Sequence, residues 1–444
     1  MTDHPPASNL PVPARAEAAR RAARKLAALD TEQRATLLRD LADALELPDS
    51  RVAIAQANAK DIEEARAAQA RGELSAALAA RLGLGPTKLR GLADGLRQLA
   101  AMPELLGSVQ LRRELDEQLV LERVACPLGV LGIVFEARPD AVPQITGLAL
   151  KSGNAVLLKG GSESLRSNRA LVTIIHGVLT EHGLDPACVA LLEDRAAFAE
   201  LLQCHRDVDL IVARGSGPFV KHVMDSTKIP VLGHSEGLCH VYLHADADPQ
   251  RAASIAVDGK CTYPAACNAV ETLLWHPDAA EATRESLQAL SDMGVELRVD
   301  AATRALIGDA IEAKDARPRD WSTEYSDLIL SVAQVPDLDA ALAHIDTYGS
   351  RHTEAIVCAD GSPAAERFLA AIDAACVFVN ASTRFADGYR FGLGAEIGIA
   401  TGKIHSRGPV GVEGLLSYRW LLRGEGQVAS DYGPGKKAFS HRDL

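Results

Sequence analysis

The chain has 444 residues, of which 47% are hydrophobic and 24% charged, a balance typical of folded globular proteins that excludes a disordered or fibrous chain. Its length predicts roughly two or three domains with sizeable cores. The 47 basic and 59 acidic side chains give a net charge of −12, which argues against general binding to nucleic acid or anionic membranes but allows a small anionic substrate in a locally basic site.

The first hundred residues predict a helical region. Residues 1–13 indicate a short disordered lead without the apolar run of a secretory signal. The sequence contains no run of about 18 apolar residues, so no transmembrane helix is expected. Residues 14 to about 104 are rich in Ala, Leu and Arg and predict helices, and Asp30 followed by Gln33 predicts a capped helix start. We expect a cytoplasmic protein.

A hairpin and a first α/β unit are predicted next. Residues 109–125 alternate polar and apolar side chains, which is typical of a β-hairpin. From 129 to about 243, apolar runs alternate with helical stretches and predict a parallel sheet covered on both faces. Such sheets bind nucleotides at the C-terminal ends of their strands. The expected strands are 129–135, 155–159, 189–192, 210–212 and 239–243.

A second α/β unit is predicted from 249 to about 405. It begins with an expected helix at 252–260. The expected strands are 269–275, 327–333, 354–358 and 375–379. The stretch 415–422 predicts an edge strand, and a polar tail follows it.

Eight scattered cysteines show no metal-binding spacing and are expected to be reduced. Cys267 lies in a predicted helix-to-strand loop, where an exposed thiol can act as a nucleophile. The alternative is a buried structural thiol, and the pattern favours Cys267 only slightly over Cys261. His344 and His352 lack thiol or carboxylate spacing, so we predict no metal site.

Two glycine-containing turns follow predicted strands and open predicted helices. Lys159-Gly160-Gly161-Ser162 is one, and Gly215-Ser216-Gly217 is the other. Glycine permits close approach of the backbone, and a helix N-terminus attracts phosphate. Each turn is equally compatible with an ordinary strand-to-helix connection.

Two arginines lie in loops near predicted strand ends. Arg138 follows the strand at 129–135, and Arg384 follows the strand at 375–379. A guanidinium group can hold a carboxylate or phosphate through two parallel hydrogen bonds. For a single arginine, a surface or interdomain salt bridge is the alternative.

Five segments together resemble the γ-glutamyl phosphate reductase family, a branch of the aldehyde dehydrogenase superfamily. They are 127–139, 148–163, 267–274, 335–356 and 378–407, and the likeness extends from about 120 to 430. Thr262-Tyr263-Pro264 departs from the Gln-Arg-Pro that is usual before the family's cysteine.

The resemblance implies an aldehyde dehydrogenase-like α/β fold, with a Rossmann-type cofactor domain, a second α/β catalytic domain and a small β oligomerisation arm. The cofactor-binding domain is expected at 1–108 and 127–238. The catalytic domain with the nucleophilic cysteine is expected at 239–407, and the arm and tail at 109–126 and 408–444.

The resemblance also implies the reaction. L-Glutamate 5-phosphate is reduced with NADPH to L-glutamate 5-semialdehyde and phosphate, in the second step of proline biosynthesis. Cys267 would form a thioester, and its backbone N–H and the Asn268 amide are candidate oxyanion donors. Arg138, Asn380 and Arg384 would bind the substrate.

For the cofactor, the resemblance implies that Lys159 contacts the adenosine ribose and that Gly215 lies near the pyrophosphate. Glu324 would contact the nicotinamide ribose. Gly160, Gly161 and Ser162 leave room for a 2′-phosphate, which predicts NADPH over NADH on the assumption that Glu163 points away. Glu236 is expected not to activate water, because activated water would destroy the thioester of a reductase.

The hairpin and the tail strand predict a homodimer or homotetramer, since exposed strands need partners. A transient contact with glutamate kinase is a further expectation, because acyl phosphates are labile. Two alternatives remain at this stage. One is an NAD-dependent aldehyde dehydrogenase that releases a free acid, and the other is a catalytically silent relative with a binding role.

Overall fold

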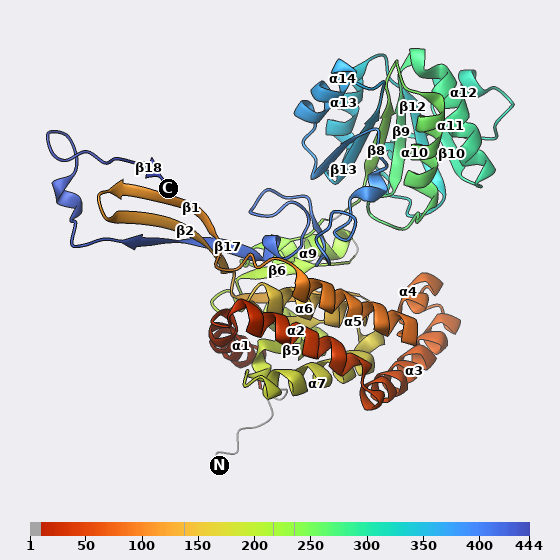
Figure 1. Ribbon diagram of the computed structural model, residues 1–444. Helices are drawn as coiled ribbons and strands as arrows, with labels where there is room; N and C mark the ends of the chain where they lie inside the picture. The colour runs from red at the N-terminus through yellow and green to blue at the C-terminus, as the bar shows by residue number, and fades with distance from the viewer. Residues whose placement is uncertain (1–9, 137, 216, 235) are drawn as a thin grey trace.

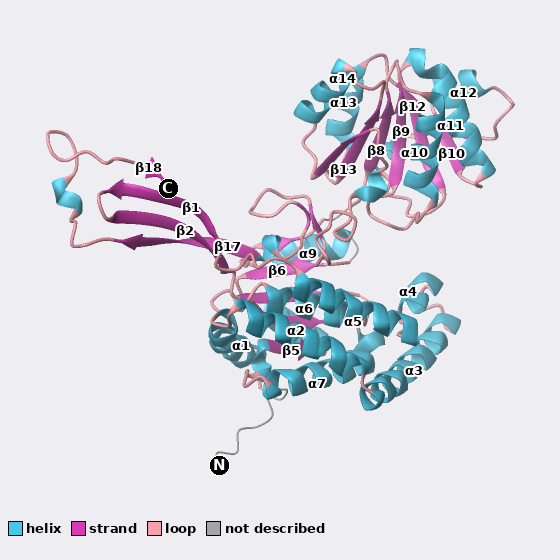
Figure 2. Ribbon diagram, in the orientation of Figure 1, coloured by secondary structure: helices cyan, strands magenta, loops and turns pink. Residues whose placement is uncertain are grey.

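The computed structural model describes residues 10–136, 138–215, 217–234 and 236–444. Most of the predicted N-terminal lead lies outside these ranges. The chain forms two α/β lobes and a projecting β arm (Figure 1, Figure 2). No helix within the described ranges is both long enough and apolar enough to cross a membrane.

Helices form the N-terminal region, as predicted. Asp30 caps the second helix in a complete capping box with Gln33, which confirms that predicted helix start. Leu37, Leu38 and Leu41 on this helix are buried in the core of the first lobe. The helices are α1 (Val12–Ala27), α2 (Thr31–Glu46), α3 (Pro48–Ala70), α4 (Ala76–Arg81) and α5 (Pro86–Ala101).

A five-stranded parallel sheet lies at the centre of the first lobe, with strand order β5-β4-β3-β6-β7. Its strands are β3 (Val130–Val134), β4 (Ala155–Lys159), β5 (Val189–Leu192), β6 (Leu210–Ala213) and β7 (Val231–Leu232). One face packs against α2, α5, α6 (Ala141–Lys151) and α7 (Leu165–Glu181). The other packs against α1, α8 (Arg195–Leu201) and α9 (Gly217–Ser226), so both faces are covered as predicted.

The second lobe contains a seven-stranded parallel sheet with strand order β11-β10-β12-β9-β8-β13-β14. Separate apolar clusters on its two faces join the sheet to the surrounding helices. The strands are β8 (Cys239–Leu243), β9 (Val270–Trp275), β10 (Glu296–Val299), β11 (Lys314–Asp315), β12 (Ile329–Gln334), β13 (Thr353–Val357) and β14 (Cys376–Val379). The helices are α10 (Pro249–Cys261), α11 (Ala280–Asp292), α12 (Ala301–Ile307), α13 (Leu338–Tyr348) and α14 (Pro363–Ala371).

After β14 the chain returns to the first lobe. Ile397, Ala400 and Val410 are buried in the first lobe's core, around the short pair β15 (Ile399–Ala400) and β16 (Gly408–Pro409). The expected end of the second domain at 407 therefore needs correction. These apolar side chains are buried against the first lobe, so the chain re-enters that lobe about ten residues before the expected boundary at 407.

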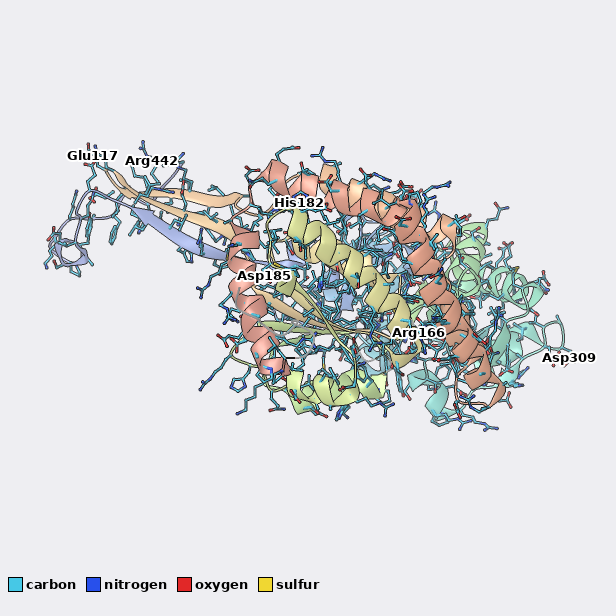
Figure 3. The ribbon with its side chains drawn as sticks, turned by 90° about the horizontal axis from the view of Figure 1, so that it is seen from below. Glu117, Arg166, His182, Asp185, Asp309 and Arg442 are labelled. Atoms are coloured by element: carbon cyan, nitrogen blue, oxygen red, sulfur yellow. The ribbon has the colours of Figure 1, made fainter. Side chains whose placement is uncertain are left out.

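The arm is an antiparallel sheet with strand order β17-β2-β1-β18. Its strands are β1 (Val109–Asp116), β2 (Leu119–Pro127), β17 (Leu416–Arg423) and β18 (Arg442–Asp443). They confirm the predicted hairpin and the predicted edge strand, while β18 shows that the polar tail also joins the sheet. Figure 3 places Glu117 and Arg442 on this arm, well away from α7, which carries Arg166 and ends just before His182.

Candidate active site

A cavity of about 950 Å³ lies between the two lobes, and Cys267 is part of its wall. Cys267 lies between the end of α10 and the start of β9, and its side chain is half-buried. Backbone hydrogen bonds from Ala266 to Tyr263 and from Ala269 to Ala266 fold this connection into a tight turn. The turn holds the thiol at the cavity wall instead of burying it in the core of the second lobe.

A second segment holds the backbone of Cys267 from behind. A Cβ at Gly237 would lie 2.1 Å from the Cys267 carbonyl oxygen and 2.7 Å from its Cα, so only glycine fits there. The Cys239 thiol donates to the same carbonyl oxygen at 3.4 Å. The segment entering β8 thus fixes the position of Cys267, a contact that the sequence analysis missed.

Arg384 lines the cavity and is 9% exposed. Its guanidinium carbon lies 5.9 Å from the centre of the Tyr263 ring. Its Nε is buried without a hydrogen-bond partner among the described residues. Burial, together with Arg390, lowers the pKa of Arg384, but an arginine keeps its charge in proteins. Arg384 therefore offers an unpaired, partly desolvated N–H to an anion in the cavity.

Two further arginines line the cavity from the first lobe. Arg138 is the more exposed, and its guanidinium group lies 4.0 Å from the Asp140 carboxylate. Arg214 directly follows β6, and the sequence analysis did not single it out. Burial and the neighbouring Arg138 lower the pKa of Arg214, while the Glu396 carboxylate acts in the opposite direction. Arg81 is the fourth arginine among the described residues of the cavity wall, and six carboxylates line the same cavity, so the positive charge is confined to the arginines' own positions.

Asn268 is buried beside Cys267 and lines the cavity. Its Nδ2 donates to the Ala386 carbonyl oxygen at 2.8 Å, and its Oδ1 is buried with no partner among the described residues. The amide is therefore fixed in orientation next to the thiol.

Two of the residues expected to bind cofactor, Lys159 and Gly215, lie at the C-terminal ends of the first lobe's strands, whereas Glu324 lies before β12 of the second lobe. Gly215 and Glu324 line the cavity. Lys159 ends β4, is 9% exposed, and its ammonium group donates to the Gly160 carbonyl oxygen. Burial lowers the pKa of Lys159, and the Glu163 carboxylate partly offsets that effect.

The turn after Lys159 is tightly surrounded. A Cβ on Gly160 would lie 2.3 Å from the Asn168 amide nitrogen, and one on Gly161 would lie 1.9 Å from a Glu163 carboxylate oxygen. The assumption that Glu163 points away from the turn is therefore wrong. Its side chain folds back over Gly161, toward the charge of Lys159.

The structure does not bring Asn380 to the cavity. Its Oδ1 accepts from the Cys358 backbone N–H at 3.0 Å, and its backbone has a left-handed φ of 54°. The side chain joins the ends of β13 and β14, and Asn380 is absent from the cavity wall formed by described residues. Its expected role in substrate binding is corrected to a structural one.

Two histidines that the sequence spacing did not connect with Cys267 lie close to it. One donor atom from each of His234, Cys267 and His352 lies within 4.8 Å of the other two. The expectation of no metal site was drawn from spacing along the chain, and the fold brings these three segments together. Glu236 also lines the cavity and is exposed.

Comparison with known proteins gives consistent matches over nearly the whole chain. The sequence model of the aldehyde dehydrogenase family matches residues 2–316. A γ-glutamyl phosphate reductase from Cyanothece sp. is 52% identical over 427 residues, 96% of each protein. One from Prochlorococcus marinus is 51% identical over 96% of this chain and 95% of its own length. The crystal structure of γ-glutamyl phosphate reductase from Thermotoga maritima matches with a TM-score of 0.89 and 34% identity, over 94% of this chain and 99% of that one.

Proposed function

Because the chain belongs to the aldehyde dehydrogenase family, and within it to the γ-glutamyl phosphate reductases, we propose that it reduces L-glutamate 5-phosphate to L-glutamate 5-semialdehyde and phosphate with NADPH. This is the second step of L-proline biosynthesis. The observation that supports it best is the half-buried thiol of Cys267 at the wall of a cavity between two α/β lobes, which Arg138, Arg214 and Arg384 also line.

Cys267 is the nucleophile in this proposal. Its thiolate attacks the acyl carbon of the substrate, and the bond from that carbon to the phosphate oxygen breaks. Inorganic phosphate departs, and the acyl group remains bound to the sulfur as a thioester. The fixed Asn268 amide beside the thiol is a candidate donor to the developing oxyanion. Arg384, Arg214 and Arg138 supply the positive charge that the α-carboxylate and the phosphate require.

The first lobe fits a nicotinamide dinucleotide. The Gly160-Gly161 turn follows Lys159 at the C-terminal end of β4, the edge at which such parallel sheets bind nucleotides. Gly215 and Glu324 line the cavity near Cys267. The bound cofactor supplies the hydride that reduces the thioester to the aldehyde.

We infer a preference for NADPH over NADH. Ser162 can donate a hydrogen bond to a 2′-phosphate, and Lys159 can neutralise part of its charge. The folded-back carboxylate of Glu163 opposes this preference, since it adds negative charge at the same turn. NADPH binding therefore requires Lys159 and Ser162 to outweigh Glu163, or Glu163 to turn away.

We also propose a homodimer or homotetramer assembled through the arm, with glutamate kinase as a transient partner that limits hydrolysis of the acyl phosphate. β17 is an edge strand that exposes Tyr418, Trp420 and Leu422 by half or more. Exposed apolar side chains on a strand at the edge of a sheet favour pairing with a second chain.

The reverse reaction tests the proposed function. NADP⁺ reduction by glutamate semialdehyde should require inorganic phosphate, because only phosphate releases the thioester as the acyl phosphate. A dehydrogenase that releases a free acid would turn over without phosphate. A catalytically silent relative would show no turnover in either condition and no preferential alkylation of Cys267.

A further inference from the structure

We propose that Cys267, His234 and His352 form a binding site for a zinc-like divalent cation, and that the bound cation reversibly blocks the nucleophile. One donor atom from each residue lies within 4.8 Å of the other two. Tetrahedral zinc with Zn–N bonds of about 2.0 Å and Zn–S bonds of about 2.3 Å separates its ligand atoms by roughly 3.3–3.6 Å. The donors must therefore close by at most about 1.5 Å on binding the ion.

The His234 ring is oriented like that of a metal ligand. Its Nδ1 lies 2.9 Å from the Ile399 carbonyl oxygen. A carbonyl oxygen only accepts, so Nδ1 carries the hydrogen and Nε2 keeps its lone pair. Such an outer hydrogen bond fixes the tautomer and ring angle of metal-binding histidines.

The His352 ring supplies a second, independent indication. It is 0% exposed, and its Nδ1 lies 2.9 Å from the Thr353 hydroxyl and 3.8 Å from the Cys239 thiol. Its Nε2 is buried with no hydrogen-bond partner among the described residues. A buried ring nitrogen without a partner is costly, and a metal ion relieves that cost.

The donor set selects the class of ion. A thiolate and two imidazoles suit zinc and similar borderline cations, whereas Mg²⁺ and Ca²⁺ prefer oxygen ligands. Three protein ligands leave a fourth position for water or a substrate oxygen. Carboxylates outnumber arginines in the cavity wall, Glu236 and Glu396 among them, and their negative charge favours a bound cation.

Coordination changes the chemistry of Cys267. The zinc–sulfur bond forms as the thiol proton leaves to solvent and the sulfur displaces a water ligand of the zinc ion, with no change of oxidation state. A sulfur lone pair held by zinc is less available for attack on an acyl carbon. The inhibition rests on the proposed role of Cys267, while the binding itself does not.

The test measures metal binding to the full-length chain without substrate. Zn²⁺ is titrated against a chromophoric chelator, Co²⁺ is used to detect a thiolate-to-metal charge-transfer band, and Mg²⁺ is the negative probe. We expect one equivalent of Zn²⁺, the Co²⁺ band, and protection of Cys267 from alkylation. His234→Ala, Cys267→Ser and His352→Asn should each weaken Zn²⁺ binding at least about tenfold. Loss of a residue that only hydrogen-bonds to a metal ligand already weakens metal affinity by about that factor, so loss of a ligand itself should weaken it by no less.

His205→Ala is the matched control and should bind Zn²⁺ like the wild type, because His205 is exposed and its ring hydrogen-bonds to the Gln203 carbonyl oxygen, away from the three proposed ligands. Because His352 is fully buried, circular dichroism is used to check that the His352→Asn variant folds. If that variant does not fold, the His234→Ala variant still tests the site, because His234 is only half-buried. Weak, non-stoichiometric Zn²⁺ binding, or wild-type affinity in His234→Ala and Cys267→Ser, overturns the site. Stoichiometric binding with turnover unaffected by Zn²⁺ overturns the inhibition and contradicts the role of Cys267, but leaves the site standing.

Discussion

Cys267 and Cys261 are close in sequence but lie in different surroundings. Cys261 ends α10 and packs against the second lobe's core, where burial raises the pKa of its thiol. Cys267 lies at the cavity wall, held by Gly237 and Cys239. A thiol acts as a nucleophile only as the thiolate, so the structure favours Cys267 by more than the sequence pattern did.

Replacing Cys267 should therefore abolish turnover. Cys267→Ala removes the sulfur that forms the thioester but leaves the first lobe unchanged, so NADPH binding should persist. Cys261→Ala is the control and should retain most activity. Turnover is measured by steady-state kinetics and cofactor binding by fluorescence. Activity in Cys267→Ala combined with its loss in Cys261→Ala would move the nucleophile to Cys261.

Arg384 should contribute more to substrate binding than Arg138. Arg384 is buried with an unpaired Nε, whereas Arg138 is exposed and already faces Asp140. Arg384→Ala should lower kcat/KM for the acyl phosphate roughly 10- to 150-fold, the equivalent of about 1.5–3 kcal/mol for a charge-assisted hydrogen bond. The Kd for NADPH should stay unchanged. A wild-type kcat/KM would mean that Arg384 only holds its own loop in place.

Cofactor choice should depend on charge at the turn after β4. Ser162→Glu removes one donor and adds a like charge, so it should weaken NADPH more than NADH by roughly 2–4 kcal/mol. Glu163→Gln is the opposite variant and should strengthen NADPH, because the carboxylate over Gly161 is lost. Steady-state kinetics with both cofactors checks both. An unchanged NADPH/NADH ratio in both variants would place the discrimination elsewhere.

Among the secondary-structure elements, α13 carries a half-buried histidine, His344, outside the site. The His344 ring packs 4.7 Å from Tyr348, 5.5 Å from His240 and 5.6 Å from Trp321, measured between ring centres. Burial, with a smaller effect of His240, lowers its pKa from 6.5 to about 4. The folded chain therefore keeps this imidazole neutral where the unfolded chain would protonate it.

This difference predicts an acid-sensitive stability. As pH falls from about 6.5 to about 4, the unfolded state binds the proton first, so up to about 3 kcal/mol of folding free energy is lost across that window. His344→Phe should lose this part of the pH dependence, while His205→Ala should keep it. Urea unfolding at pH 7 and pH 4.5 measures the difference. An identical pH dependence in His344→Phe would contradict the assignment.

At the scale of the whole molecule, the arm is a small β-sheet that stands apart from the cores of the two lobes. It projects from the lobes and ends in the C-terminus (Figure 1). On its edge strand β17, Tyr418 is 51% and Trp420 is 50% exposed. The Arg123 guanidinium carbon lies 5.1 Å from the Tyr418 ring centre and 6.0 Å from that of Trp420, which holds the two aromatic side chains together on one face.

Trp420→Glu should therefore weaken self-association without unfolding either lobe. A buried aromatic residue contributes strongly to an interface, so the dissociation constant should rise at least about tenfold, or about 1.4 kcal/mol. Met293→Glu changes an equally exposed apolar side chain, 54% exposed, on the second lobe and serves as the control. Sedimentation velocity over a range of concentrations distinguishes them. A monomeric wild type, or equal behaviour of the two variants, would rule out assembly through β17.

The elements were predictable because their signals are local. Asp30 and Gln33 cap a helix within one turn of each other, and 155–159 and 189–192 form strands with the predicted bounds. Continuous apolar runs of this length suit strands that are buried on both faces of a parallel sheet. Sequence motifs also predicted the family and its α/β fold, and the comparisons confirm both.

The site depends on contacts between distant parts of the chain, which local pattern does not encode. His234 and His352 meet Cys267 because the segment before β8, the turn before β9 and the start of β13 lie side by side in one sheet. Glu163 folds back over Gly161 toward the charge of Lys159, and the Asn380 side chain accepts a hydrogen bond from the Cys358 backbone N–H. Periodicity along the chain predicts which residues are buried in an element, whereas the order of strands in the sheet sets which side chains share a cavity.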